Sequence, residues 1–224
     1  MVADSAQTAA TMILTIDGPA AAGKSSVARA LARELGLTFL DTGAMYRAVT
    51  WAALARGVDP ADAAGCGRVA RAIVLTFDAD GRIWIDGFPG EPEIRGPEVT
   101  RSVSVVAAWP EVRRVIVPLQ RTEAARRGGL VAEGRDMGTV VFPQAEHKFF
   151  LVASAPVRAR RRAAELGMPQ RFGEILADIE RRDHLDETRV DSPLVRAADA
   201  TLIDTDSLDV PGVVARMLAI VRKR

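Results

Sequence analysis

The feature that most restricts this chain is a glycine-rich segment, GPAAAGKSS, at residues 18–26. It satisfies the pattern GxxxxGK[ST]. An apolar, β-prone run at 12–16 precedes it, and a segment with an apolar residue at every fourth position, 27–35, follows it. A strand, a glycine-rich loop and a helix in this order bring successive backbone N–H groups and the positive helix end around a phosphate chain. The alternative, an ordinary glycine-rich turn, is disfavoured because pattern and context agree.

The residues of this loop have distinct predicted roles. Gly18 and Gly23 allow the backbone to turn sharply. The Lys24 ammonium is expected to reach the β- and γ-phosphate oxygens of ATP, and the Ser25 hydroxyl is expected to bind Mg²⁺. The predicted ATP-binding residues are Gly18, Pro19, Ala20, Ala21, Ala22, Gly23, Lys24, Ser25 and Ser26.

Beyond the loop, predicted strands and helices alternate. A short strand at 37–40 leads to a helix at 44–56, and buried strands return at 130–132, 148–152 and 200–203. Further helices are predicted at 156–166, 172–186 and 210–221. This alternation is typical of an α/β fold with a parallel sheet flanked by helices.

One part of the chain departs from this alternation. Residues 73–77 and 82–86 alternate in period two around the turn DADG, which predicts an antiparallel hairpin. We therefore expect a small antiparallel β lobe inserted into the parallel core. The predicted division is a flexible tail at 1–11, a core at 12–64 and 108–224, and an inserted lobe at 65–107.

Two prolines shape the expectation for the segment after the hairpin. The stretch DGFPG at 86–90 is interpreted as a turn. Pro110 is expected at the first position of a helix that runs towards Gly128. Pro118 lies inside that helix, where it predicts a kink or a break.

Composition excludes several kinds of partner. The 224 residues carry 30 basic and 29 acidic side chains, a net charge of +1, which argues against a protein that coats nucleic acid. No apolar run approaches the ~18 residues that cross a membrane. The single cysteine, Cys66, cannot form an internal disulfide and is interpreted as a core or loop residue. We expect a cytoplasmic monomer without membrane contact.

The class of phosphate-loop protein can be narrowed further. The sequence contains no asparagine, so it lacks the NKxD motif with which GTPases read guanine, and it is too short for the partner domains of a motor or transport ATPase. A small-molecule kinase remains. Since 27 of the 30 basic residues are arginines, the chain is rich in the side chain that best binds phosphate. An acceptor that carries a phosphate monoester has a second pKa of about 6. It is therefore already a nucleophile at neutral pH and needs no general base.

A basic cluster, VRARRRAAEL at 157–166, begins the helix after the strand at 148–152. A nucleic-acid patch would need interleaved aromatic residues, which are absent. We interpret residues 157–171 as a lid that closes over ATP and excludes water. The alternative is a solvated helix face.

Three stretches resemble the bacterial cytidylate kinase family: LDTGAMYR at 40–47, EGRDMGTVVFP at 133–143, and RRDHLDETR at 181–189, followed by SPL. The resemblance runs from about Met12 to the C-terminus. It implies a nucleoside monophosphate kinase fold of the P-loop type with a CMP-binding insert and a lid. The implied activity is transfer of the γ-phosphate of ATP to CMP and dCMP with Mg²⁺.

The resemblance also implies roles for individual residues. Ser104, Arg113 and Asp136 would face the base, and a carboxylate beside the amino group of cytosine is complementary, whereas uracil presents a carbonyl oxygen there. Arg47, Arg135 and Arg182 would bind the CMP phosphate and Asp186 the sugar. The predicted catalytic residues are Lys24, Arg158, Arg162 and Arg189.

Simpler structural interpretations stand beside these roles. Thr42 binds substrate or caps a helix. Ser104 is a helix cap or a packed hydroxyl, and Arg113 forms a surface ion pair. Asp186 and Arg189 lie three positions apart and could pair with each other on one helix face. Other functions also remain open: a kinase for AMP or shikimate, or a regulatory protein that binds ATP without turnover.

Overall fold

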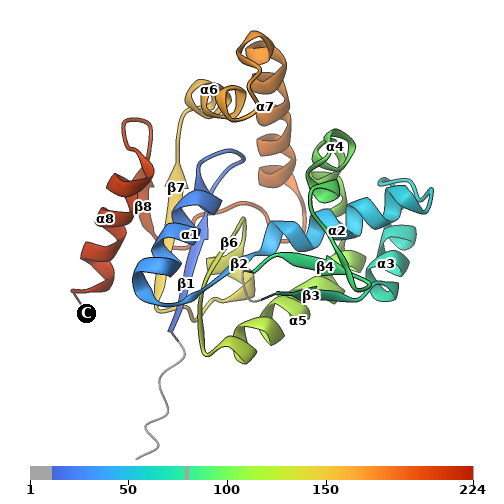
Figure 1. Cartoon of the computed structure of the whole chain (residues 1–224), viewed down its shortest axis with the longest axis horizontal. Coiled ribbons are helices and arrows are strands. Elements are labelled where there is room, and N and C mark those ends of the chain that lie inside the picture. The colour runs from blue at the N-terminus through green and yellow to red at the C-terminus, as the bar shows by residue number, and fades with distance from the viewer. Residues whose placement is uncertain (1–11, 79–80, 224) are drawn as a thin grey trace, which may run out of the picture.

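A five-stranded parallel sheet forms the centre of the protein (Figure 1). The structure, a computed structural model, describes residues 12–78 and 81–223, so the predicted tail at 1–11 lies outside the described residues. The strand order is β2-β6-β1-β7-β8, and every neighbouring pair is parallel, as predicted. The strands are β1 (Met12–Asp17), β2 (Thr38–Asp41), β6 (Gly129–Gly134), β7 (His147–Val152) and β8 (Thr201–Asp204).

Helices cover both faces of this sheet. On one face, α1 (Lys24–Leu35) and α8 (Val210–Val221) pack against apolar side chains of β1 and β7. On the other face, α5 (Pro110–Arg127) packs against β2 and β6. Since β1 lies between strands that continue to opposite sides, its carboxyl end is the place where sheets of this kind bind ligands.

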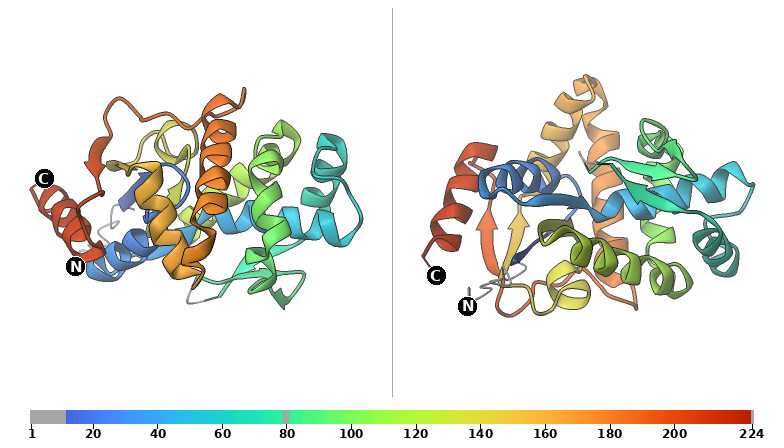
Figure 2. Two further views of the ribbon diagram at one scale, coloured as in Figure 1. Left: turned by 90° about the horizontal axis from the view of Figure 1, so that it is seen from above. Right: turned by 60° about the horizontal axis from the view of Figure 1, so that its bottom comes forward.

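A second, smaller sheet lies beside the core. Strands β3 (Leu75–Phe77), β4 (Ile83–Ile85) and β5 (Phe88–Pro89) are antiparallel, which confirms the predicted hairpin. Asp86 and Gly87 both have positive φ, 51° and 85°, and form the turn between β4 and β5. Figure 2 shows this sheet together with helices α2 to α4 at the end of the molecule away from α8. The boundaries of an inserted lobe at 65–107 remain a prediction.

Two helices of this region are absent from the sequence prediction. α3 (Ala63–Ala72) contains Gly65 and Gly67, which weaken helix propensity, and α4 (Pro97–Val106) follows a segment rich in Gly and Pro. Packing against other helices stabilises α3, although its own sequence does not favour a helix. A Cβ at Gly67 would lie 2.6 Å from the Glu111 Cβ, so glycine lets α3 approach α5 closely. Cys66 is fully buried in this core, which confirms its interpretation as a core residue.

Helix α5 has no break at Pro118, where the sequence predicts a kink or a break. It continues through that residue from Pro110 to Arg127. Pro118 and Arg114 are both exposed, so the hydrogen bond that the proline removes lies on the solvent side of the helix, where water replaces it. Burial of Val112 and Ile116 on the opposite side holds the helix in place.

Two helices project above the carboxyl edge of the sheet (Figure 1). They are α6 (Ala155–Glu165) and α7 (Phe172–Thr188), and α2 (Thr42–Ala55) runs from the same edge into the smaller lobe. Short turns of helix occur at Glu93–Arg95, Met137–Val141 and Pro169–Arg171, the second with π geometry. Among the described residues, no helix is long and apolar enough to cross a membrane.

Candidate active site

The glycine-rich loop between β1 and α1 has the predicted conformation. Gly18 has φ of +150°, and a Cβ there would lie 2.2 Å from the carbonyl oxygen of Leu151 on β7. Gly23 caps α1 with φ of 84°, and Ala21 has φ of 58°. Only glycine fits the first position, because the loop passes directly against the neighbouring strand.

A cavity of about 1150 Å³ opens above this loop. Its floor includes the second half of the loop, residues 21–26, where the helix N-terminus points its free N–H groups. Gly18, Pro19 and Ala20 are not among its lining residues. The Ala20 N–H instead donates to Asp183 Oδ1 at 3.0 Å, so of the predicted loop only residues 21–26 face the cavity.

Lys24 is buried at the centre of the loop. Its Nζ donates to the carbonyl oxygen of Pro19 at 2.7 Å, and burial together with the charge of Arg135 lowers its pKa to about 7. Glu133, at the end of β6, accepts a hydrogen bond from Ser25 Oγ, and burial raises its pKa. The sequence analysis missed Glu133, although it belongs to the EGRD stretch and follows a predicted buried strand.

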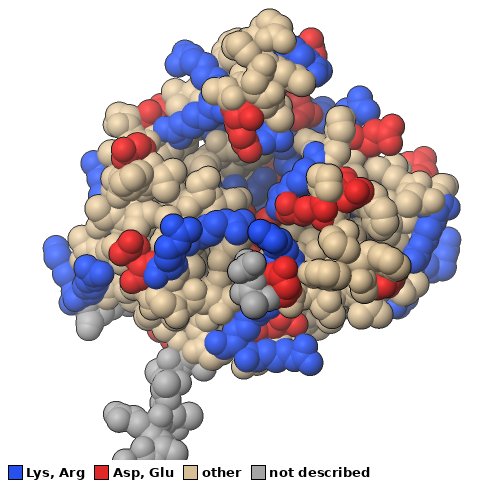
Figure 3. Space-filling model, viewed as in Figure 1, with Lys and Arg blue, Asp and Glu red and all other residues tan. Residues whose placement is uncertain are grey.

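Five arginines of the prediction line the same cavity: Arg47, Arg135, Arg162, Arg182 and Arg189. Burial and the nearby Arg182 charge lower the pKa of Arg47 to about 9. Burial and the Arg135 charge likewise lower the pKa of Arg182, whose Nε has no hydrogen-bond partner. Cations that destabilise one another are stabilised by an anion between them. Figure 3 shows Lys and Arg side chains in and around the hollow beneath α6 and α7.

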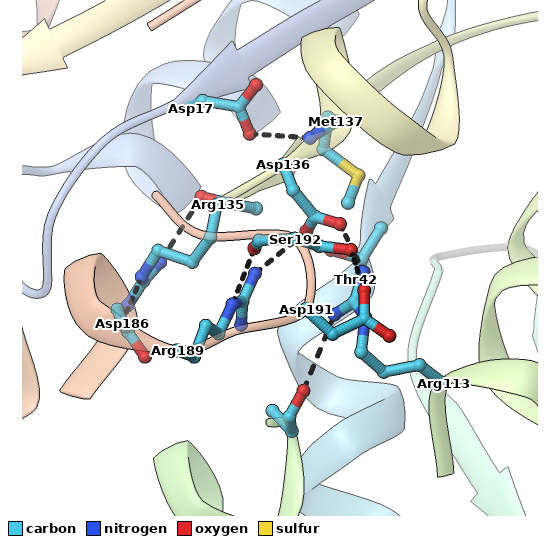
Figure 4. Close-up of polar contacts among 12 residues, drawn as sticks. Asp17, Thr42, Arg113, Arg135, Asp136, Met137, Asp186, Arg189, Asp191 and Ser192 are labelled. Atoms are coloured by element: carbon cyan, nitrogen blue, oxygen red, sulfur yellow. Dashed lines mark hydrogen bonds and ion pairs between the residues drawn. The ribbon is translucent and has the colours of Figure 1, made fainter. Parts of the chain in front are cut away.

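Asp136 lies between two buried arginines (Figure 4). It forms an ion pair with Arg113 Nη2, and Arg189 Nη2 lies 3.4 Å from Asp136 Oδ1. The Arg113–Asp136 pair is buried, with side chains 4% and 3% exposed, so the surface ion pair considered for Arg113 is wrong. Asp136 and Arg189 line the cavity, whereas Arg113 lies behind them.

The simpler interpretation, in which Asp186 pairs with Arg189, is wrong. Asp186 accepts a hydrogen bond from Arg135 Nε at 2.6 Å, across from α7 to the end of β6 (Figure 4). Burial and three nearby arginines act on the Asp186 carboxylate, and the arginines prevail, so its pKa lies below the usual range.

Thr42 and Ser104 are both buried cavity residues. Thr42 does not cap α2, because Asp41 does so by accepting the Ala44 N–H at 2.9 Å. Thr42 Oγ1 donates instead to the Glu133 carbonyl at 2.5 Å. Ser104 lies in the second half of α4, which begins after Gly96, so the helix-cap interpretation of Ser104 is also wrong.

The basic cluster of α6 divides into different environments. Arg158 is buried under the phosphate loop and donates to the Ala20 carbonyl at 2.9 Å, so it does not line the cavity. Arg162 lines the cavity and pairs with Glu165 at 2.8 Å. Of the four arginines in this cluster only Arg160 is exposed, so the solvated-face interpretation holds for that residue.

A second carboxylate that the sequence analysis missed is Asp17, at the end of β1. One oxygen accepts the Met137 N–H at 2.9 Å (Figure 4), and the other accepts the Gly138 N–H at 2.8 Å. These are the first two residues of the π-helical turn after Asp136. Burial raises the pKa of Asp17 to about 6. Its position directly before the glycine-rich loop was the available signal.

Comparison with known proteins identifies the family. The family model described as cytidylate kinase matches residues 14–223. The chain belongs to the cytidylate kinase family. It is similar to a cytidylate kinase of Mycobacterium leprae (strain Br4923), with 48% identity over 216 residues that cover 95% of this chain and 96% of the relative.

Solved structures support the fold. The chain resembles a gluconokinase from Sinorhizobium meliloti 1021, with a TM-score of 0.52 at 16% identity, over 96% of this chain and 93% of the other. It also resembles a shikimate kinase from Bacteroides thetaiotaomicron, with a TM-score of 0.50 at 14% identity, over 94% and 98%. These likenesses confirm the predicted kinase fold with its parallel sheet.

Proposed function

We propose that the protein transfers the γ-phosphate of ATP to CMP or dCMP and releases ADP and CDP or dCDP. The observation that carries this proposal is one continuous cavity that joins the phosphate loop, residues 21–26, to a cluster of partly buried arginines. Two anionic substrates placed at these two ends would meet end to end. Membership of the cytidylate kinase family supports CMP as the acceptor.

The donor end would bind the triphosphate through main-chain N–H groups and one ammonium group. The loop amides and the N-terminus of α1 supply fixed donors. Lys24 would exchange its hydrogen bond with the Pro19 carbonyl for phosphate oxygens. Since phosphoryl transfer depends on positioning and on neutralising charge, these donors act before any bond changes.

The acceptor end would hold the CMP phosphate between Arg47, Arg135 and Arg182. Their mutual repulsion is relieved by the incoming dianion, and this relief contributes to binding. The acceptor oxygen is already ionised near neutral pH, so no side chain has to remove its proton. Arg162 and Arg189, also at the cavity wall, would stabilise charge on the transferring group.

The residues at Ser25 fit a magnesium ion. Mg²⁺ prefers hard oxygen ligands and is usually bound by one or two protein oxygens together with substrate phosphates and water. The Ser25 hydroxyl and the Glu133 carboxylate lie in contact beside the phosphate loop and could hold it directly or through water. When bound, the ion would neutralise phosphate charge.

The base would be read by buried polar groups. Asp136 offers a carboxylate to the amino group of cytosine, and Ser104 offers a hydroxyl from α4. Arg113 would hold the carboxylate from behind rather than touch the base. Asp186, fixed by Arg135, would face the sugar.

The next proposal concerns the oligomeric state of the protein and its lid. The residues that line the cavity all belong to one chain. We propose a cytoplasmic monomer in which residues 157–171 close as a lid. Light scattering of the active enzyme tests the monomer: a particle of about 24.0 kDa is expected, and a stable dimer contradicts it.

Product analysis tests the proposed function. Equimolar ATP and CMP with Mg²⁺ should yield ADP and CDP over many turnovers, as measured by ion-exchange chromatography. Lys24→Ala is expected to remain folded and to lose about 10²–10³-fold in kcat. Binding of ATP without CDP formation would instead support a regulatory protein.

A further inference from the structure

An ion pair beneath the phosphate loop connects three parts of the chain. Arg158 of α6 and Asp183 of α7 lie with Nη1 and Oδ2 2.6 Å apart, and their side chains are 7% and 12% exposed. Asp183 Oδ1 accepts the Ala20 N–H at 3.0 Å, and Arg158 Nη1 donates to the Ala20 carbonyl at 2.9 Å. Both backbone polar groups of one loop residue are therefore held by this pair. We call Arg158, Asp183 and Ala20 the loop clamp.

The loop clamp fixes the orientation of the peptide units that precede the anion-binding amides. The next residue, Ala21, has φ of 58°, which is uncommon for a residue with a side chain and needs support from its surroundings. Arg158 is itself anchored, because its Nε donates to the Ala153 carbonyl at 2.8 Å. Without the clamp, the Ala20 peptide could rotate and turn the following N–H groups away from the triphosphate.

The same helix carries groups of the acceptor end. Arg182 precedes Asp183 directly, and Asp186 lies one turn further along α7; both line the cavity. Burial and the Arg135 charge lower the pKa of Arg182, although Arg135 also pairs with Asp186 of the same helix. The repulsion between Arg135 and Arg182 therefore opposes part of the attraction that holds α7 against the end of β6. An acceptor phosphate between the two arginines removes it and holds the helix, and with it Asp183, in place.

We propose that Asp183 is a positioning residue that links the acceptor site to the phosphate loop. Acceptor bound at α7 stabilises the loop clamp, so ATP meets a loop that is already ordered. By thermodynamic reciprocity, ATP strengthens acceptor binding by the same factor. The inference rests on the proposed function, because it takes CMP as the acceptor.

Equilibrium binding of a non-hydrolysable ATP analogue, with and without CMP, tests the link. The ratio of the two dissociation constants measures the coupling, expected at about 5- to 150-fold in the wild type. Asp183→Asn retains an oxygen for the Ala20 N–H but removes the charge that pairs with Arg158. Its coupling ratio is expected to fall towards 1, and kcat by about 100-fold, since a small misplacement of bound substrate has that effect.

Glu180→Gln is the matched control. Glu180 is an exposed carboxylate of the same helix and does not line the cavity. It should keep the wild-type coupling ratio. A purely structural role for Asp183 would lower the melting temperature of Asp183→Asn and leave the ratio unchanged, which would overturn the inference. Equal loss in both variants would also overturn it.

A second variant tests the loop clamp if the first one does not fold. If Asp183→Asn fails to fold, Asp183→Glu, which retains the charge for Arg158 but displaces it, takes its place. A reduced ratio supports the loop clamp, and a wild-type ratio rejects it. Failure of the proposed function is distinguishable, because the wild type would then form no CDP at all.

Discussion

Replacing Asp136 with asparagine asks directly whether this carboxylate reads the acceptor base. Asp136 is 2% exposed and lies at the cavity wall between Arg113 and Arg189. Asparagine has nearly the same shape, but its amide can turn either an oxygen or an NH₂ group towards the base. The change therefore removes the discrimination between an amino group and a carbonyl oxygen without opening a cavity.

The magnitude follows from the cost of mismatched buried polar groups. A carboxylate that faces the carbonyl oxygen of uracil costs about 1–3 kcal/mol, and the amide removes this cost. Since each ~1.4 kcal/mol is about tenfold, the ratio of kcat/KM for CMP to that for UMP should fall by about one to two decades. The loss of a buried charge partner should also destabilise the fold by about 3–5 kcal/mol.

Steady-state kinetics with CMP and UMP, at a temperature where urea titration shows the variant folded, provide the assay. Asp191→Asn is the matched control, because Asp191 Oδ1 also lies near Arg113, at 3.6 Å from Nε, but its side chain is 40% exposed and outside the cavity lining. The control should keep the wild-type CMP preference. An unchanged preference in Asp136→Asn would refute the base-reading role.

Three further predictions concern charge. The pKa of Lys24, lowered to about 7 by burial and Arg135, means that its ammonium is lost as the pH rises through that value; calorimetry should show the Kd for ATP rising by up to about tenfold per pH unit above pH ~7, and a flat profile would contradict this. Arg182→Met should raise the KM for CMP by about 10- to 100-fold, while the free energy of unfolding in urea stays equal or increases because repulsion is relieved; an unchanged KM would be inconsistent with phosphate binding. The pKa of Asp17 is raised to about 6 in the folded protein from 3.8, so the folded state binds more protons between these values and the contribution of Asp17 to stability falls as the pH rises through them. The unfolding free energy of wild type minus that of Asp17→Asn should therefore decrease by about 2 kcal/mol from pH ~4 to pH ~7, and a constant difference would show that Asp17 is not perturbed.

Elements with strong local signals could be predicted from the sequence. Helix α8 begins and ends at the predicted residues, Val210 and Val221, and α1 follows the predicted apolar spacing. Helix α3 could not be predicted, because Gly65 and Gly67 weaken its helix propensity. In the folded protein Gly67 allows α3 to pack closely against Glu111 of α5. Helix α5 does not break at Pro118, because burial on its far side outweighs one hydrogen bond on its solvent side.

Only part of the candidate site could be predicted from the sequence. Motif residues such as Lys24 and Arg182 could be named from the sequence, and their roles remain predictions. The carboxylates Asp17, Glu133 and Asp183 could not be assigned, because their contacts depend on strand register and helix packing. Glu133 lies opposite Ile16 in the sheet, which brings it beside the phosphate loop from more than a hundred positions away.

We propose that one cavity brings ATP and cytidine monophosphate together. The most direct test is to measure kcat/KM of the wild type for CMP, UMP, AMP and shikimate with saturating ATP in a coupled ADP-release assay. A clear preference for CMP over the other three acceptors is the predicted result. Faster turnover of AMP or shikimate than of CMP would contradict the assignment of the acceptor site.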